Sequence, residues 1–218
     1  MPKKPPIKRR KIKRREFKFL DRESYKNALI ELYKKTDAFY YIPLYSLLKR
    51  LFKEKLRKRL SIVEIGYGEE KNFIEVLKHM GFKSIIGYDL RGREMKSNRM
   101  QLLVGDVLDI DKRIERESQD VIIARGVFET YGWRSPNPIF HEFPEENKEK
   151  LKQIFSKVFS VLKPGGILIL APISYIEYPE TVKEALSHFG EVFSYKTIVA
   201  DTKEELLVIR KFKKSKKA

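Results

Sequence analysis

The stretch Ile62-Val63-Glu64-Ile65-Gly66-Tyr67-Gly68-Glu69-Glu70 determines how the rest of the chain is interpreted. An apolar run that contains a carboxylate is followed by two glycines, and residues with helical spacing come next. Glycines at such a turn let the backbone approach a ligand closely and adopt conformations that a Cβ atom forbids. We therefore expect a buried strand, a glycine turn and the start of a helix, with a ligand at the turn.

Short apolar runs alternate with helical stretches through most of the chain that follows. The runs are Ser61–Ile65, Ser84–Tyr88, Leu102–Val104, Val121–Ala124 and Ile167–Leu170. Helical stretches are expected near Lys71–Met80, Met95–Met100, Asp111–Glu117 and Glu145–Leu162. This βαβ alternation predicts an α/β fold with a doubly wound, mostly parallel sheet and helices on both faces.

The last part of the chain departs from this alternation. A helix at Thr181–His188 is followed by strands at Val192–Val199 and Leu206–Phe212, separated by only six residues. A parallel crossover needs a longer connection, so these two strands are expected to be antiparallel neighbours.

The residues before Leu60 have a helical pattern. One helix is expected from Asp21 or Ser24 through Lys34, and a second after Thr36 or Asp37. The apolar stripe of the second helix consists of Leu44, Leu47, Leu48, Leu51, Phe52 and Leu56. We divide the chain into a basic tail (1–20), a helical extension (21–60), the α/β domain (61–213) and a second basic tail (214–218).

Polar residues follow the other expected strands. The second run ends in Gly87-Tyr88-Asp89-Leu90, where a carboxylate of a doubly wound sheet faces the ribose hydroxyls of a nucleoside. The third is followed by Gly105-Asp106-Val107, whose acid could accept from the exocyclic amine of adenine. The fourth starts at Asp120 and runs into Arg125-Gly126-Val127-Phe128-Glu129, and the fifth follows the turn Leu162-Lys163-Pro164-Gly165-Gly166. Two of these acids also have a structural interpretation: Asp89 could cap a helix, and Asp106 could open a tight turn. Asp109 stands at a spacing similar to that of Asp106 and could be mistaken for it.

In this order, the segments resemble class I S-adenosylmethionine-dependent methyltransferases, closest to the small UbiE-like (type 11) branch, over about residues 60–212. The resemblance implies a seven-stranded sheet of order 3-2-1-4-5-7-6 with an antiparallel last strand, and S-adenosylmethionine as cofactor. It implies that the methionine and ribose end is lined by Glu64, Gly66, Tyr67 and Gly68. It also places Asp89 on the ribose diol, Leu90 against adenine, Asp106 on the adenine amine beside the Val107 amide, and Arg125 where cofactor meets substrate.

Two residues depart from the family's pattern. Glu70 stands where a third glycine is usual, and Glu64 replaces the more usual Asp. A dinucleotide-binding fold would also place an acid after the second strand, but it requires Gly-x-Gly-x-x-Gly, and the sixth position is Lys71. The cofactor expected is therefore S-adenosylmethionine rather than NAD.

Residues 130–146 form a long insert after the fourth strand, and an insert of this length is often a functional lid. Tyr131, Trp133 and Arg134 could stack on a base or clamp a planar substrate. Glu129 and His141 are candidate proton acceptors, should the methyl acceptor carry a proton that must leave. The chain has no Cys, which excludes a cysteine nucleophile, and its three His are scattered, so no metal site is expected.

The net charge of +17 is concentrated in three segments. Residues 1–19 carry +9, residues 49–59 carry +6, and residues 210–217 hold six bases and no acid. Such clustering suggests a polyanionic partner, and we expect a nucleic acid, RNA rather than DNA. Two alternatives stay open. The charge could be the surface of a thermophile's small-molecule methyltransferase, or the chain could be a catalytically inactive nucleic-acid-binding protein with this fold.

No apolar stretch approaches the ~20 residues of a membrane span, and residues 1–20 lack the apolar core of a signal peptide. A soluble, cytoplasmic protein without a membrane partner is expected.

Overall fold

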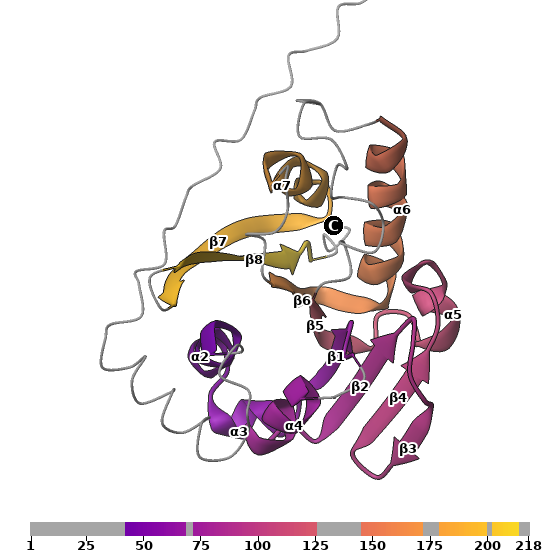
Figure 1. Ribbon diagram of the computed structural model, residues 1–218, viewed down its shortest axis with the longest axis vertical. Coiled ribbons are helices and arrows are strands. Elements are labelled where there is room, and N and C mark those ends of the chain that lie inside the picture. The colour runs from indigo at the N-terminus through magenta and orange to yellow at the C-terminus, as the bar shows by residue number, and fades with distance from the viewer. Residues whose placement is uncertain (1–41, 69–71, 126–144, 172–178, 200–201, 214–218) are drawn as a thin grey trace, which may run out of the picture.

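The apolar runs form a mixed sheet in the computed structural model, which describes residues 42–68, 72–125, 145–171, 179–199 and 202–213 (Figure 1). The strands are β1 (Ser61–Ile65), β2 (Ser84–Asp89), β3 (Met95–Ser97), β4 (Met100–Val104), β5 (Gln119–Arg125), β6 (Leu162–Ala171), β7 (Gly190–Val199) and β8 (Thr202–Lys211). The helices are α2 (Ile42–Leu51), α3 (Glu54–Arg57), α4 (Asn72–His79), the 3-10 helix η2 (Val107–Asp109), α5 (Ile110–Arg113), α6 (Glu145–Val161) and α7 (Pro179–Ser187). Within these ranges, every helix is too short or too polar to span a lipid bilayer.

The eight described strands have the order β3-β4-β2-β1-β5-β6-β8-β7. Strands β4, β2, β1, β5 and β6 are parallel, β8 is antiparallel to β6, and β7 is antiparallel to β8. Without β3, this is the order 3-2-1-4-5-7-6 that the resemblance to class I methyltransferases implies. The prediction of an antiparallel final pair is confirmed, and residues 200–201 alone separate its two strands.

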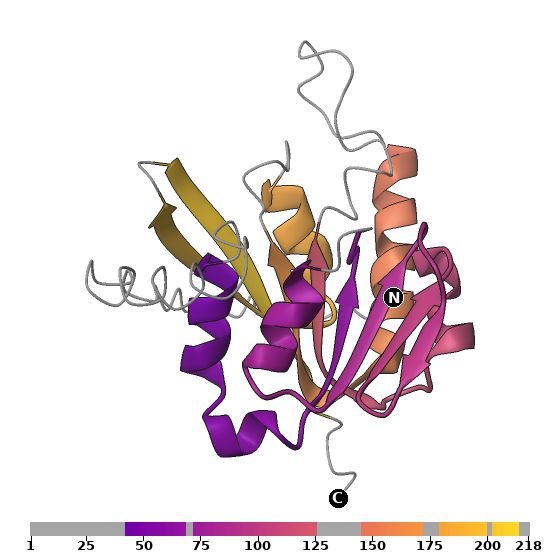
Figure 2. The same cartoon turned by 60° about the horizontal axis from the view of Figure 1, so that its bottom comes forward.

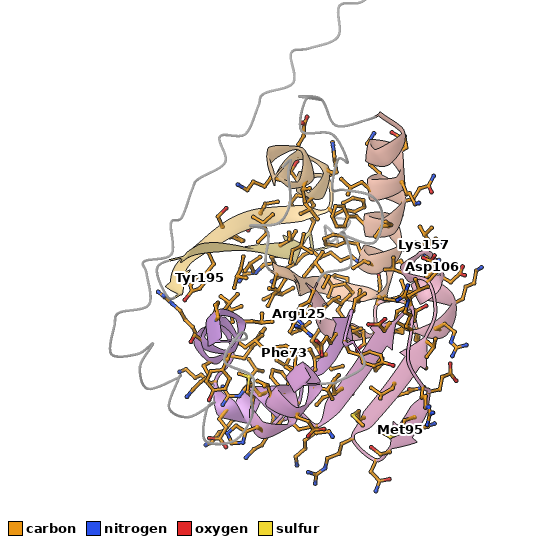
Figure 3. The ribbon with its side chains drawn as sticks, in the orientation of Figure 1. Phe73, Met95, Asp106, Arg125, Lys157 and Tyr195 are labelled. Atoms are coloured by element: carbon orange, nitrogen blue, oxygen red, sulfur yellow. The ribbon has the colours of Figure 1, made fainter. Side chains whose placement is uncertain are left out.

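Strand β3 corrects two predictions, the count of seven strands and the short helix near Met95–Met100. Residues 95–97 pair antiparallel with β4, through a turn at Asn98 and Arg99. All three residues of β3 are exposed, and Met95 lies at the outer edge of the sheet (Figure 3). These residues have no apolar face that a helix could bury against the sheet. They pair instead with the backbone groups at the free edge of β4.

The turn predicted at residues 162–166, before the strand predicted at Ile167–Leu170, is part of strand β6. Strand β6 begins at Leu162, and its pairing with β5 shifts between Gln119, opposite Leu162, and Val121, opposite Ile167. Residues 163–166 form the irregularity, and Gly165 has a φ of +78°, which favours glycine.

Helices cover both faces of the sheet (Figure 2). One core cluster joins apolar side chains of α2 and α4 to one face, and reaches Tyr195 of β7 and Leu206 and Val208 of β8. The other cluster joins α5, α6 and α7 to the opposite face. The predicted helices at 145–162 and 181–188 are confirmed within about two residues.

The predicted basic helix is two helices. The stripe residues Leu44, Leu47, Leu48 and Phe52 are buried, but the helix breaks after Leu51 and resumes at Glu54. The break rotates Leu56 outward, and its side chain is 45% exposed. The expected helix from residue 21 or 24 to 34 lies outside the described residues.

Gly190 is the tightest glycine of the sheet. A Cβ atom there would lie 2.7 Å from the carbonyl carbon of Arg210 and closer to its oxygen, and backbone atoms cannot rotate away. We expect Gly190→Ala to lower the free energy of unfolding by about 3 kcal/mol in urea denaturation. Gly81→Ala is the control, since a Cβ at Gly81 meets no atom within 4 Å and its φ of +89° adds backbone strain alone. A smaller loss for Gly190→Ala than for Gly81→Ala would contradict the steric argument.

Candidate functional site

The parallel strands bring their carboxyl ends to one edge of the sheet, at the point where the strand order reverses. Strand β1 has β2 on one side and β5 on the other. Loops that follow such neighbours diverge to opposite faces, which opens a crevice suited to a ligand. Glu64, Asp89, Asp106 and Arg125 all lie at this edge, as the sequence predicts.

The turn after β1 has the conformation that its glycines allow. Gly66 and Gly68 have φ values of +81° and +68°. The Gly66 amide donates to the Tyr88 carbonyl at 2.8 Å, which continues the β1–β2 pairing past Ile65. A side chain at either glycine would be strained, so the two glycines are required by the backbone whatever the turn binds.

Asp89 holds the glycine turn from the end of β2. Its Oδ2 accepts from the Gly68 amide at 2.9 Å, and its Oδ1 accepts from the Arg91 amide at 3.0 Å. These two bonds fix the carboxylate between two loops, and each oxygen retains a lone pair for another donor. Leu90 follows directly, with its side chain 50% exposed. A fixed acid beside an exposed apolar side chain suits a ligand with hydroxyls and an apolar ring.

Glu64 and Arg125 form an ion pair beneath the edge, a contact that the sequence did not predict. Glu64 is fully buried, and its Oε1 accepts from Arg125 Nε at 2.8 Å and from Nη2 at 2.6 Å. The guanidinium also lies 5.3 Å from the ring centre of Phe73 on α4, and Figure 3 shows the two side chains together. Phe73 is a site residue that sequence reasoning missed, because nothing in an apolar helix position indicates that a cation lies on it.

Burial controls the titration of Glu64. Desolvation is the main cause that raises the pKa of its carboxyl from 4.5 to about 7. The charge and hydrogen bond of Arg125 limit this rise, and the charge of Asp89 adds to it. Glu64 Oε2 is buried and has no hydrogen-bond partner among the described residues. The carboxylate can therefore accept one more donor at this edge.

Asp106 shapes the loop after β4. Its Oδ1 accepts from the Leu108 amide at 2.9 Å and so caps η2. Its carbonyl accepts from Tyr88 Oη at 2.9 Å, and the Gly105 amide donates to the Asp89 carbonyl at 2.9 Å. Tyr88 and Gly105 belong to the predicted strand-end motifs, but the motifs alone gave no sign of this hydrogen-bond network. The Val107 side chain is buried in the core, so its amide alone stays a candidate for ligand contact.

Tyr67 packs inward from the glycine turn. Its ring lies against Gly87 and its hydroxyl against Gly92, where a Cβ atom would clash. Burial, with the charges of Asp89 and Glu94, raises the pKa of this tyrosine. Its hydroxyl has no hydrogen-bond partner among the described residues. Gly92 was missed from the sequence because its partner, Tyr67, lies in another loop.

The proposed substrate and proton-transfer residues lie outside the described residues: Glu129, Tyr131, Trp133, Arg134 and His141. Glu70, the departure from the family's glycine, does so as well. Their roles stay predictions. Within the described ranges, no three His, Cys, Asp or Glu side chains gather in a way that could hold a metal ion.

Comparison with known proteins finds the fold but no close relative. No family model and no curated protein matches the chain. A protein of Methanococcus maripaludis described as an S-adenosyl-L-methionine-dependent methyltransferase superposes with a TM-score of 0.51 at 16% identity, covering 89% of this chain and 94% of the other. Human methyltransferase-like protein 13, in complex with SAH, gives 0.51 at 19% identity, over 78% and 81%. The CurJ carbon methyltransferase gives 0.50 at 16% identity, over 87% and 59%. The chain has the fold of class I S-adenosylmethionine-dependent methyltransferases.

Proposed function

We propose that this chain is an S-adenosylmethionine-dependent methyltransferase that acts on a nucleic acid, RNA rather than DNA. The observation that carries the proposal is the carboxylate of Asp89, held by the amides of Gly68 and Arg91 at the switch point of a methyltransferase fold. An acid that merely capped a helix would need neither the glycine turn nor its own position between two loops.

The residues at this edge fit the proposed cofactor. Asp89 would accept from the ribose hydroxyls, Leu90 would contact adenine, and Asp106 would accept from the adenine amine. Glu64 would accept from the ammonium group of the methionine part, because one of its buried oxygens has no partner among the described residues. When bound, the cofactor supplies an electrophilic methyl group on a sulfonium.

The protein's own contribution to such a transfer is orientation and the exclusion of water. The Asp89 bonds hold the glycine turn in one conformation, and Tyr88 does the same for the loop at Asp106. Arg125 limits the rise in the pKa of Glu64 that burial causes, since its charge and hydrogen bond lower that pKa, so the carboxyl titrates near neutral pH. A sulfonium placed here would thus face a carboxylate whose charge depends on one arginine.

The nucleic-acid acceptor is supported by the charge distribution. The segments 1–19, 49–59 and 210–217 carry more than the whole net charge of +17, so the remaining chain is slightly acidic. Of the described basic residues in these segments, Arg57 and Lys211 serve the fold, through hydrogen bonds to backbone carbonyls, while most of the others are exposed. Exposed cations in clusters favour phosphate neutralisation and counterion release.

Isothermal titration of the full chain with S-adenosylmethionine, S-adenosylhomocysteine and NADH tests the cofactor. We expect micromolar binding of the first two and none of NADH, because the turn lacks the third glycine of a dinucleotide site. Binding of NADH alone would contradict the proposal. Binding of none would favour the inactive nucleic-acid-binding alternative, and cofactor binding without RNA binding would favour the small-molecule methyltransferase.

A further inference from the structure

A row of cations borders the edge at which the parallel strands begin. Arg59 lies two residues before β1, and Lys83 and Arg99 immediately precede β2 and β4. These three strands are neighbours, and the first residue of β1 pairs with the first of β2, whose second residue pairs with the first of β4. Because neighbouring strands lie about 4.8 Å apart, the backbone positions of the three residues span about 10 Å across this edge.

The segment of α3 adds two more cations to this edge, Lys53 directly before the helix and Lys55 within it. The buried Arg57 side chain donates to the Met80 carbonyl and to the Phe52 carbonyl, both at 2.8 Å. These bonds fix α3 against the end of α4, beside the loop that leads to Lys83. Lys53 and Lys55 are exposed on this fixed segment. We call Lys53, Lys55, Arg59, Lys83 and Arg99 the amino-edge row.

The charge of the amino-edge row is not neutralised locally. All five side chains are exposed, and none is within salt-bridge distance of an acid in the part of the chain that the structure describes. Two acids at this edge have other partners, since Glu54 pairs with Lys58 at 3.3 Å and Asp120 with Lys163 at 2.9 Å. The row therefore presents a group of positive charges without acidic partners among the described residues.

The amino-edge row and the cofactor site lie at opposite edges of the sheet. The row precedes the strands, or in the case of Lys53 and Lys55 lies on the segment that leads to them, whereas Asp89 ends β2 and Asp106 follows β4. A strand of six residues, such as β2, spans about 20 Å. A ligand held by the row is therefore separated from the methyl-transfer edge by the length of a strand.

We propose that the amino-edge row is a docking surface for the backbone of a nucleic acid, remote from the point of methyl transfer. The inference rests on the proposed nucleic-acid partner and deepens it, because it names the surface and requires an acceptor long enough to reach around the sheet. An acceptor shorter than about 20 Å cannot contact both edges at once.

The composition of this edge favours a nucleic acid over a lipid surface. Large exposed apolar side chains on the edge, among the described residues, are Leu56 and Phe212, at 45% and 51% exposure. Insertion into a bilayer needs a continuous apolar face, which two separate side chains do not provide. An exposed aromatic ring near cations suits base stacking instead.

The test compares two variants that lose the same number of charges. The edge variant carries Lys55→Gln, Arg59→Gln, Lys83→Gln and Arg99→Gln. The control variant carries Lys112→Gln, Lys150→Gln, Lys152→Gln and Lys183→Gln, on the helices α5, α6 and α7 of one face. Binding of a labelled single-stranded RNA of mixed sequence is measured by fluorescence anisotropy over a series of salt concentrations, with phosphatidylserine vesicles as the competing partner.

We expect the edge variant to bind RNA at least about tenfold more weakly than the wild type, with a salt slope shallower by up to about 3. The control variant should lose less than about threefold, and both should keep the thermal midpoint and cofactor affinity of the wild type. If the edge variant unfolds, Lys83→Gln/Arg99→Gln replaces it, with an expected loss of about fivefold.

Three other outcomes would overturn the docking surface, the nucleic-acid partner or both. Equal RNA binding by the edge and control variants overturns the docking surface and leaves the nucleic-acid partner standing. No RNA binding by the wild type overturns both, while its cofactor titration still decides the methyltransferase proposal. Binding to vesicles but not to RNA replaces the nucleic acid with a lipid surface.

Discussion

Asp89→Ala is expected to weaken S-adenosylmethionine binding by about 100-fold or more. A carboxylate that accepts from two ribose hydroxyls makes two charge-assisted hydrogen bonds, each worth about 1.5 kcal/mol or more, and a loss of about 3 kcal/mol is a factor of about 100. The same change removes the bonds to the Gly68 and Arg91 amides, which adds a cost in ordering the turn. Isothermal titration of the variant measures the loss.

Asp109→Ala is the matched control for this measurement. Asp109 lies at the same edge, three residues after Asp106, but its carboxylate pairs with Lys112 at 2.7 Å on an exposed surface. We expect its cofactor affinity to stay within about twofold of the wild type, since an exposed pair contributes little. Unchanged binding by Asp89→Ala, in a protein that binds the cofactor, would show that the ribose contact is wrong.

Arg125→Gln is expected to lower the free energy of unfolding by about 3 kcal/mol at pH 8, because it leaves the Glu64 carboxylate buried without its counter-charge. The loss should shrink toward pH 5. The pKa of Glu64 in the folded wild type is raised from 4.5 to about 7, so the folded state binds more protons than the unfolded state between these values, and stability falls as the pH rises through that window. Without Arg125 the folded pKa rises further, and the fall extends above pH 7.

Urea denaturation at several pH values, with NMR titration of the Glu64 carboxyl, measures both effects. The double variant Glu64→Gln/Arg125→Gln should recover most of the stability at pH 8 and lose this part of the pH dependence. Arg113→Gln is the control, since its pair with Glu94 is exposed and should change stability by less than about 1 kcal/mol. An equal loss for Arg125→Gln at pH 5 and pH 8 would mean that packing on Phe73, not charge, is what Arg125 contributes.

The parts of the fold that follow from burial were predictable from the sequence. Strands β1, β2 and β5 are apolar runs buried on both faces, and their carboxyl ends bring Glu64, Asp89 and Arg125 to one edge. Strand β3 was not predictable, because all three of its residues are exposed and only the neighbouring edge of β4 determines its conformation. The break after Leu51 was also missed, since the apolar spacing continues unchanged through Leu56.

The contacts within the site were less predictable than its location. The resemblance implied that Glu64 and Arg125 both lie at the cofactor edge, but not that they form a buried pair with a shifted titration. Likewise the hydroxyl of Tyr88, on β2, reaches the Asp106 carbonyl in the loop after β4, and no spacing within one segment encodes that distance. Pairings between strand ends depend on side-chain length and rotamer, which a pattern of residue types does not specify.

The packing of α2 has a consequence for the order in which the molecule assembles during synthesis. Helix α2 precedes every described strand in the chain, yet it shares a core cluster with Tyr195, Leu206 and Val208 of the last two strands. A nascent chain would expose the Leu44 and Leu48 stripe until those strands emerge from the ribosome. Such a contact between distant segments slows folding and leaves an apolar helix open to chaperones or to other chains in the meantime.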